Sequence, residues 1–207
     1  MEKVLALYQH PYDPPRPVVC LDESSRQLLG QTRSQLPPSV GQSARQDYEY
    51  QRHGTANLFM LLEPLAGWRQ VPVTERRTQR DRARVVKDLL DGRHADAEKV
   101  VLVQDNLNTH TPASLYATLA PAEARGLAQG LELHYTPKHG SWLNMAEVEF
   151  SVLARTLWER LERREQQESA AAAWSQRGNQ AQVGVNRRFT TVDARIKLKR
   201  LYPTINV

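Results

Sequence analysis

The sequence predicts a mixed α/β fold, and three observations support this prediction. Residues 99–104 form an almost entirely apolar, Val-rich segment, which is typical of a strand buried on both faces. Shorter apolar runs precede it and are separated by polar, Pro- or Gly-containing turns, which favours antiparallel strands. Apolar residues then recur at helical spacing in the segments around and after it. With 207 residues, the chain can bury roughly 70% of its unfolded surface, so a hydrophobic core alone can stabilise it.

The first half of the chain predicts a meander of antiparallel strands. A Pro-rich segment, residues 11–17, ends directly before the first apolar run. Turn residues separate the later runs, and Ala66-Gly67 is the clearest of these turns. The expected strands cover residues 18–21, 27–32, 58–62 and 68–73, and a polar loop over 33–51 separates the second from the third.

Helices and strands alternate in the second half. Thr111-Pro112 begins one helix, because Pro is favoured at the first helical position, and Gly92 follows the end of another. The expected helices cover residues 78–90, 111–119 and 144–161, and the expected strands cover 99–104 and 131–135. Three antiparallel strands followed by alternating helices and parallel strands form the arrangement of the ribonuclease-H-like fold. We therefore expect a mixed five-stranded sheet with flanking helices.

Composition excludes several classes of protein. The longest apolar run, residues 58–62, is far shorter than the ~20 residues that a membrane helix requires, so we expect no membrane partner. The single cysteine, Cys20, cannot form an intrachain disulfide, and the N-terminus lacks the pattern of an export signal. These features favour a cytoplasmic protein. The sequence also contains neither zinc-ligand spacing nor a Gly-rich phosphate loop.

The basic charge lies at the C-terminal end of the chain. Residues 151–207 contain 11 Lys and Arg against 5 Asp and Glu, whereas residues 1–150 contain 17 against 18. Of the 28 basic residues, 22 are Arg, whose planar guanidinium suits phosphate oxygens. A codon bias would produce the same excess of Arg. Composition therefore makes nucleic acid one candidate partner among others.

Three acidic residues occupy positions that favour a shared site. Asp22 and Asp105 stand at the carboxyl ends of expected strands, where open α/β sheets bind ligands. Glu147 lies in the first turn of the last expected helix, and Glu149 is its alternative two residues later. An Asp after a strand is also a common turn or cap residue, and a Glu near a helix start is favoured by the helix dipole. Spacing alone does not choose between the two glutamates.

Three converging carboxylates would repel one another unless a cation neutralised them. Hard oxygen ligands of this kind suit Mg²⁺ or Mn²⁺. Two such ions about 3.5–4 Å apart can activate a water or hydroxyl group and stabilise the leaving oxygen in phosphoryl transfer. The acids therefore point to metal-dependent phosphodiester chemistry.

Three sequence motifs resemble those of the DDE transposases, and more closely those of the bacterial insertion-sequence family numbered 630, which is related to the mariner elements. The motifs occur in the family's order, and the similarity extends from about Val18 to the C-terminus. They are Val-Cys-Leu-Asp-Glu-Ser over 19–24, Val-Leu-Val-Gln-Asp-Asn-Leu-Asn-Thr-His over 101–110, and Tyr-Thr-Pro-Lys-His-Gly-Ser-Trp-Leu-Asn-Met-Ala-Glu over 135–147. The resemblance selects Glu147 over Glu149, because the family's third acid stands three residues after the Asn of its Leu-Asn-x-x-Glu motif.

The resemblance implies a function as well as a fold. It implies that Asp22, Asp105 and Glu147 are catalytic and hold two Mg²⁺ or Mn²⁺ ions. It further implies DNA cleavage at element ends and strand transfer into target DNA. We expect three parts: a short lead-in over 1–17, a catalytic domain over 18–165 and a basic helical tail over 166–207.

The expected partners are the transposon ends, the target DNA and a second copy of the chain. Family members place helix-turn-helix domains before the catalytic domain, so we also expect a separately encoded portion to supply them. Two alternatives remain: an inactive DNA-binding remnant, and a structure-selective nuclease of the same fold.

Polar and basic residues around the acids are candidates for DNA contacts. Donors after Asp105 could orient a phosphate or a water, although such residues also cap helices. Lysines and arginines in the later loop and in the tail could contact the DNA backbone, although charged runs are commonly solvated faces. The candidates are Asn106, Asn108, His110, Lys138, His139, Arg187, Arg188, Lys197 and Lys199.

Overall fold

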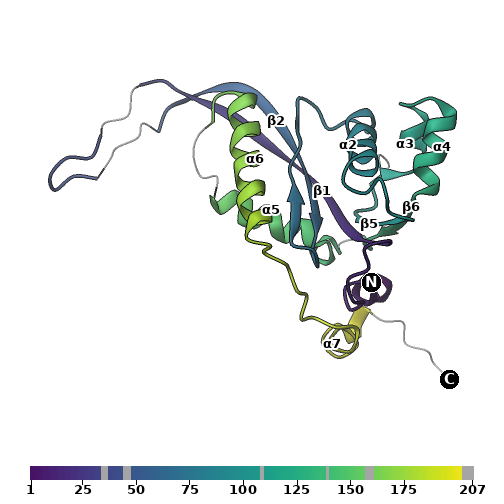
Figure 1. Ribbon diagram of the computed structural model, residues 1–207. Coiled ribbons are helices and arrows are strands. Elements are labelled where there is room, and N and C mark those ends of the chain that lie inside the picture. Colours follow the sequence, from purple (N-terminus) through teal and green to yellow (C-terminus); the bar gives the residue numbers. More distant parts are fainter. Residues whose placement is uncertain (34–36, 44–47, 108–109, 139, 157–160, 202–207) are drawn as a thin grey trace.

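The centre of the protein is a mixed sheet built around one long antiparallel pair (Figure 1). The computed structural model describes all residues except 34–36, 44–47, 108–109, 139, 157–160 and 202–207. Within these residues the sheet has six strands in the order β3-β2-β1-β5-β6, and β4 also pairs with β2. The strands are β1 (Val18–Gln31), β2 (Tyr50–Glu63), β3 (Trp68–Gln70), β4 (Val73–Thr74), β5 (Val100–Gln104) and β6 (Leu131–Tyr135).

The long pair corrects the prediction for the first strands. The sequence predicted a strand at 18–21 and a returning strand at 27–32, but β1 continues unbroken to Gln31 and β2 is the strand that returns. The polar residues between the two predicted strands are not a turn, because Asp22 pairs with Met60 and Ser24 pairs with Leu58. The far end of the pair extends past α6 (Figure 1).

The edge of the sheet differs from the prediction for a related reason. The single strand expected at 68–73 is two strands, β3 and β4, which are separated at Val71-Pro72. Pro72 has no N–H group for a ladder, and its carbonyl instead accepts a hydrogen bond from the Phe59 N–H (2.9 Å). The sheet has six strands, whereas a five-stranded sheet was predicted. The turn before β3 lies at Ala66-Gly67 as expected, with Gly67 at φ 64°.

Helices cover both faces of the sheet and create two hydrophobic layers. The helices are α1 (Glu2–Leu7), α2 (Gln79–Asp91), α3 (Ala113–Tyr116), α4 (Pro121–Gln129), α5 (Met145–Thr156), α6 (Arg164–Gln180) and α7 (Thr191–Lys197). Two short 3₁₀ turns, η2 (Ser141–Leu143) and η3 (Lys199–Leu201), complete the described elements. One layer contains buried residues of α1, α5, α6 and α7, and the other contains those of α2, α3 and α4.

Alternation along the strands assigns each residue to one of these layers. In β1, Val19 and Leu21 are buried in the α2 layer, whereas Cys20 is buried in the α5 layer. In β5, Leu102 is buried in the α2 layer and Val103 in the α5 layer. Because side chains alternate with a period of two, the residues that follow Cys20 and Val103 by two positions belong to the α5 face.

Most helix predictions are confirmed, with differences at the ends. The helix predicted at 78–90 is α2, which Thr78 caps through a reciprocal hydrogen-bond pair with Asp81. The helix predicted to end at residue 161 is α5, whose described part ends at Thr156. Helices α1 and α4 were not predicted from the sequence. No helix among the described residues has the length and apolar character needed to cross a membrane.

The N- and C-terminal helices pack beside each other (Figure 1). Val4 and Leu5 of α1 are buried in the α5 layer together with Ala194 of α7. The guanidinium of Arg195 makes two hydrogen bonds of 2.8 Å to the carboxylate of Glu2. The start and the end of the chain therefore both contribute to the core on the α5 side.

Candidate active site

Parallel pairing of β1 with β5 brings two of the predicted acids together. The register pairs Cys20 with Val103, so Asp22 and Asp105 lie two positions further along neighbouring strands. Both follow residues that are buried in the α5 layer, which places both side chains on the α5 face of the sheet. Asp105 comes directly after the end of β5, as the sequence predicted, whereas Asp22 lies inside β1 and not at its end.

The third predicted acid, Glu147, comes from the first turn of α5. Asn144 fixes this turn onto the sheet, because its amide Nδ2 donates to the carbonyl of Leu21 (2.8 Å) while its Oδ1 accepts from the N–H of Ala146 (3.2 Å). Asn144 is almost completely buried. A single side chain thus connects the residue before Asp22 to the residue before Glu147.

The three carboxylates influence one another electrostatically. Burial, and to a smaller extent the negative charges of Asp105, Glu147 and Glu23, raise the pKa of Asp22 to about 6, although a hydrogen bond from the Glu23 N–H opposes the shift. The Oε2 atom of Glu147 is buried and has no hydrogen-bond partner among the described residues. The site therefore concentrates negative charge at Asp22 and Glu147.

This arrangement has the chemistry of a site for a divalent cation. Its donors are carboxylate oxygens, which Mg²⁺ and Mn²⁺ prefer, and the buried oxygen of Glu147 lacks a partner. Among the described residues no three His, Cys, Asp or Glu side chains already lie close enough together to hold one metal ion. The donor set fits a metal, and binding would require the side chains to turn towards one another.

The alternative acid, Glu149, lies on the other side of α5. Its Oε1 atom is 3.1 Å from Nε of Arg69, and both side chains are about 95% buried. Arg69 also donates to the carbonyl of Val183 and lies over the ring of Trp174. Glu149 is therefore committed to an ion pair in the core.

Behind Asp105 lies a buried polar network that the sequence analysis did not identify. His110 is fully buried and contacts both Asp105 and Glu23. Burial lowers the pKa of His110, but the neighbouring carboxylates of Asp105 and Glu23 raise it more, to about 9. Arg82 and Gln104 extend this network into the core.

Two signals in the sequence could have revealed this network. Gln104 is a polar residue in an otherwise apolar strand, and it is fully buried. Arg82 stands four residues before Val86 and seven before Leu89, so it lies on the apolar stripe of its helix. A charged residue at such a position has to find its partners inside the protein.

The structure separates the predicted DNA-contacting residues into three groups. Asn106, Lys138, Arg188, Lys197 and Lys199 are exposed. His110 and Arg187 are turned to other protein atoms, and this geometry gives no support to a direct contact with DNA for either. The remaining two, Asn108 and His139, lie outside the described residues.

Arg187 supports the loop that precedes α5. Its guanidinium donates to the carbonyls of Leu143 (3.2 Å) and Trp142 (3.0 Å), and it lies over the rings of Trp142 and Tyr8 at 5.2 and 5.8 Å. Burial lowers its pKa. Arg187 thus attaches the C-terminal segment to the turn that presents Glu147.

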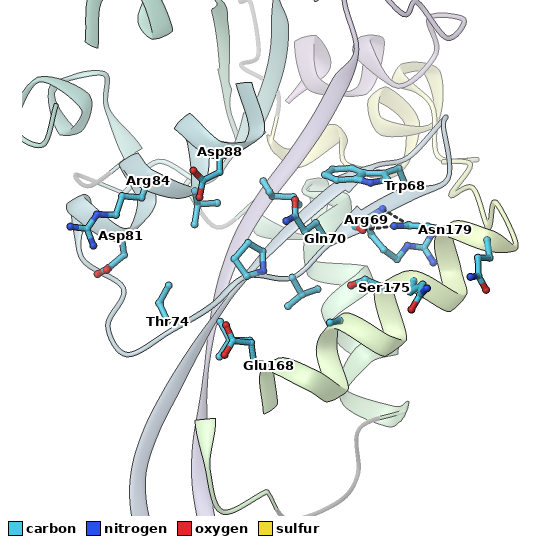
Figure 2. Close-up of a pocket in the computed structure, with 18 residues that line it drawn as sticks. Trp68, Arg69, Gln70, Thr74, Asp81, Arg84, Asp88, Glu168, Ser175 and Asn179 are labelled. Atoms are coloured by element: carbon cyan, nitrogen blue, oxygen red, sulfur yellow. Dashed lines mark hydrogen bonds between the residues drawn. The ribbon is translucent and has the colours of Figure 1, made fainter. Parts of the chain in front are cut away.

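A cavity of about 1000 Å³ lies apart from the acids (Figure 2). It is bounded by the β3–β4 edge of the sheet, α2 and α6, and its lining contains none of the three predicted acids. Asn179 of α6 closes one side, because its amide group makes a reciprocal pair of hydrogen bonds with the backbone of Arg69 (2.7 and 2.8 Å). This cavity is therefore not evidence for an active site in a different place from Asp22, Asp105 and Glu147.

Comparison with known proteins identifies related sequences and folds. Residues 17–169 match the family model described as DDE superfamily endonuclease. The search of curated proteins found no match.

Solved structures of Mos1 have a similar fold. A paired-end complex with the left transposon end aligns with a TM-score of 0.55 and 15% identity, covering 81% of this chain and 52% of that one. The Mos1 mariner paired-end complex with Mn aligns with a TM-score of 0.55 and 17% identity, covering 88% and 56%. These likenesses confirm the expected ribonuclease-H-like fold, and the chain spans about half the length of these Mos1 chains.

Proposed function

Because the chain belongs to the DDE superfamily of endonucleases, we propose that it is the catalytic domain of a transposase that cleaves DNA strands and joins them to target DNA. Within that superfamily we assign it to the insertion-sequence 630 group on the three motifs that contain Asp22, Asp105 and Glu147. The observation on which the proposal depends is the convergence of these three acids from β1, the end of β5 and the start of α5.

Asp22, Asp105 and Glu147 are the residues that would hold divalent cations. When bound, two Mg²⁺ or Mn²⁺ ions supply the activation of a water or 3′-hydroxyl and the stabilisation of the leaving oxygen. The protein's part is to present carboxylates from three separate elements on one face of the sheet. Asn144 does this for Glu147 by fixing the first turn of α5 against β1.

Exposed basic and polar residues near the acids would bind the DNA backbone. Lys138 precedes the turn to α5, and Asn106 follows Asp105 directly; both are exposed. Arg188, Lys197 and Lys199 are also exposed, and they would add phosphate contacts from the C-terminal segment. Phosphate contacts of this kind position a duplex without reading its sequence.

We propose that recognition of the DNA sequence and pairing of the transposon ends depend on further protein parts. We propose that residues 18–165 form the catalytic unit and that a separately encoded helix-turn-helix portion recognises the transposon ends. A second copy of the chain would bring two ends together. The protein's proposed place of action is the bacterial cytoplasm, where its DNA substrate lies.

A nicking and joining assay tests this function directly. The chain would be incubated with Mn²⁺, a labelled duplex with a free 3′-hydroxyl and a supercoiled plasmid, and both nicked plasmid and labelled plasmid would be measured. We expect both products from the wild type, and a loss of at least about 100-fold in Asp105→Asn and Glu147→Gln. The exposed Asp96 provides the matched control, because Asp96→Asn removes an acid far from the site.

The same assay separates the alternatives. Nicking without labelled plasmid would indicate a structure-selective nuclease in place of a transposase. DNA binding with neither product would indicate an inactive remnant. Products that persist in both acid variants would overturn the assignment of the site.

A further inference from the structure

His110 makes contacts with two carboxylates through its two ring nitrogens. Nδ1 is 3.1 Å from the backbone carbonyl oxygen of Asp105 and is also in ion-pair contact with the Asp105 carboxylate. Nε2 is 2.9 Å from Oε1 of Glu23. The imidazole is about 1% exposed, and the Glu23 side chain is 6% exposed, so solvent does not compete for these contacts.

The backbone of His110 is held from the core side. Its carbonyl accepts hydrogen bonds from Nε2 of Gln104 (2.7 Å) and from the hydroxyl of Tyr135 (3.1 Å). Arg82 in turn donates to Oε1 of Gln104 (2.6 Å) and to the hydroxyl of Ser114 (3.0 Å). The position of His110 is thus fixed by side chains from α2, α3, β5 and β6.

The buried charge of Arg82 shows that this network does more than fill space. Arg82 is 1% exposed, and among the described residues it has no carboxylate within ion-pair distance. Burial lowers its pKa, whereas the negative charges of Glu23 and Asp105 favour its charged form. Burying a cation without a carboxylate partner is costly. Here the positive charge of Arg82 partly offsets the negative charges of Glu23 and Asp105, which His110 contacts.

Glu23 holds the imidazole through its other ring nitrogen. Because Asp22 lies on the α5 face and neighbouring strand residues alternate, the side chain of Glu23 lies on the α2 face, as does its pairing partner Phe59. Its hydrogen bond to His110 commits one of its oxygens to the interior.

We propose that His110 is a positioning residue, which is held by Glu23 and orients the carboxylate of Asp105 for metal binding. This inference rests on the proposed function, because it takes Asp105 as a metal ligand. Residues that orient ligands in this way typically change metal affinity or activity by 10- to 100-fold when they are replaced. Arg82 and Gln104 act through His110 and are positioning residues of the same kind.

The test measures Mn²⁺ binding to the full chain without DNA, by calorimetry. We expect His110→Ala to weaken binding about 10- to 100-fold. His110→Asn places an amide N–H near the position of Nδ1 and should recover most of the affinity, whereas His110→Gln mimics only the contact to Glu23 and should not. Glu23→Gln should change the affinity less than about threefold, because Glu23 is not a ligand.

The outcomes distinguish this inference from the proposed function. If the wild type binds no Mn²⁺, or binds it as tightly as Asp105→Asn does, the proposed site fails and the role of His110 fails with it. If Asp105→Asn abolishes binding but His110→Ala retains wild-type affinity, only the positioning role is overturned. Should His110→Ala not fold, as judged by circular dichroism, the other two variants decide. Tighter Mn²⁺ binding by His110→Asn than by His110→Gln supports the positioning role, and equal binding by the two overturns it.

Discussion

Glu149 and Arg69 form a buried ion pair with 3.1 Å between Oε1 and Nε, and this pair places the two glutamates of α5 on different sides of the helix. Residues two apart in a helix are separated by about 200° around its axis. Since Glu149 points into the core beneath β3, Glu147 is the glutamate that faces β1 and the acids near it. The ion pair therefore provides a structural reason for a choice that spacing left open.

The first prediction concerns these two glutamates. Glu147→Gln should abolish Mn²⁺-dependent nicking and leave the unfolding free energy nearly unchanged. Glu149→Gln should lower the unfolding free energy by about 3 kcal/mol, because it leaves the charge of Arg69 buried without its partner, yet nicking per folded molecule should persist at low temperature. Urea unfolding and plasmid nicking of both variants check this. Loss of nicking in a stable, folded Glu149→Gln variant would contradict it.

The second prediction concerns metal and stability. A ligand that binds only the folded state stabilises it, by about 2.7 kcal/mol at a concentration of 100 Kd. Mn²⁺ should therefore raise the melting temperature of the wild type, and Asp105→Asn should lose most of this increase while remaining folded. Thermal unfolding followed by circular dichroism, with Asp96→Asn as the control, measures the effect. Equal shifts in wild type and Asp105→Asn would show that the metal binds elsewhere.

The third prediction concerns Arg187. Arg187→Ala removes two hydrogen bonds to the carbonyls of Trp142 and Leu143, so it should lower the unfolding free energy by about 2 kcal/mol. It should also weaken Mn²⁺ binding, because these carbonyls belong to the turn that presents Glu147. The exposed neighbour Arg188 is the matched control, and Arg188→Ala should stay within about 0.5 kcal/mol of wild type. Similar unfolding curves for the two variants would refute the structural role of Arg187.

Arg187 also illustrates how far the sequence could lead. The strand at 99–104, the turn at Ala66-Gly67 and the three acids follow from local patterns, because alternation, turn chemistry and motif spacing are properties of neighbouring residues. An Arg in a basic segment resembles any solvated cation, and only tertiary contacts reveal that Arg187 binds carbonyls 44 and 45 residues away. The long β1 was predicted as two strands for a similar reason. Residues 22–26 are polar and have no strand pattern of their own, and only their pairing with residues 56–60 of β2 reveals that the strand continues.

The fourth prediction concerns pH and His94, which is largely buried against Trp68. Burial lowers the pKa of His94, and Arg93 lowers it further, although Glu63 opposes the shift. Because the folded-state pKa lies below the unfolded value, this stability is present above about pH 6.5 and is lost as the pH falls through the folded-state value.

Replacing His94 should remove this contribution. His94→Gln should show a smaller loss of unfolding free energy between pH 7 and pH 5 than the wild type does. The exposed His10 provides the control, and His10→Gln should keep the wild-type dependence. Urea unfolding at several pH values measures both. An unchanged pH dependence in His94→Gln would mean that other groups cause the acid sensitivity.

The fifth prediction concerns DNA binding by the C-terminal segment. Arg188, Lys197 and Lys199 are exposed, whereas Arg187 is occupied by carbonyls, so the first three should contact phosphates. Each neutralised phosphate contributes about 0.9 to the slope of log affinity against log salt. Replacing all three with Gln should therefore reduce the slope by about 2 to 3 and weaken binding to unrelated duplexes equally. Fluorescence anisotropy on two duplexes across a salt series measures this.

The control for this experiment removes charge from the other side of the protein. Lys99 precedes β5 at the end opposite Asp105, and Arg125 is exposed on α4, which packs in the other hydrophobic layer. Replacing both with Gln should change the salt slope much less per charge than the C-terminal substitutions do, because the counterions released on binding come from the phosphates that the protein contacts. Equal changes per charge would mean that binding follows net charge alone. A strong preference of the wild type for one duplex would instead require groups that read base edges, which phosphate contacts do not provide.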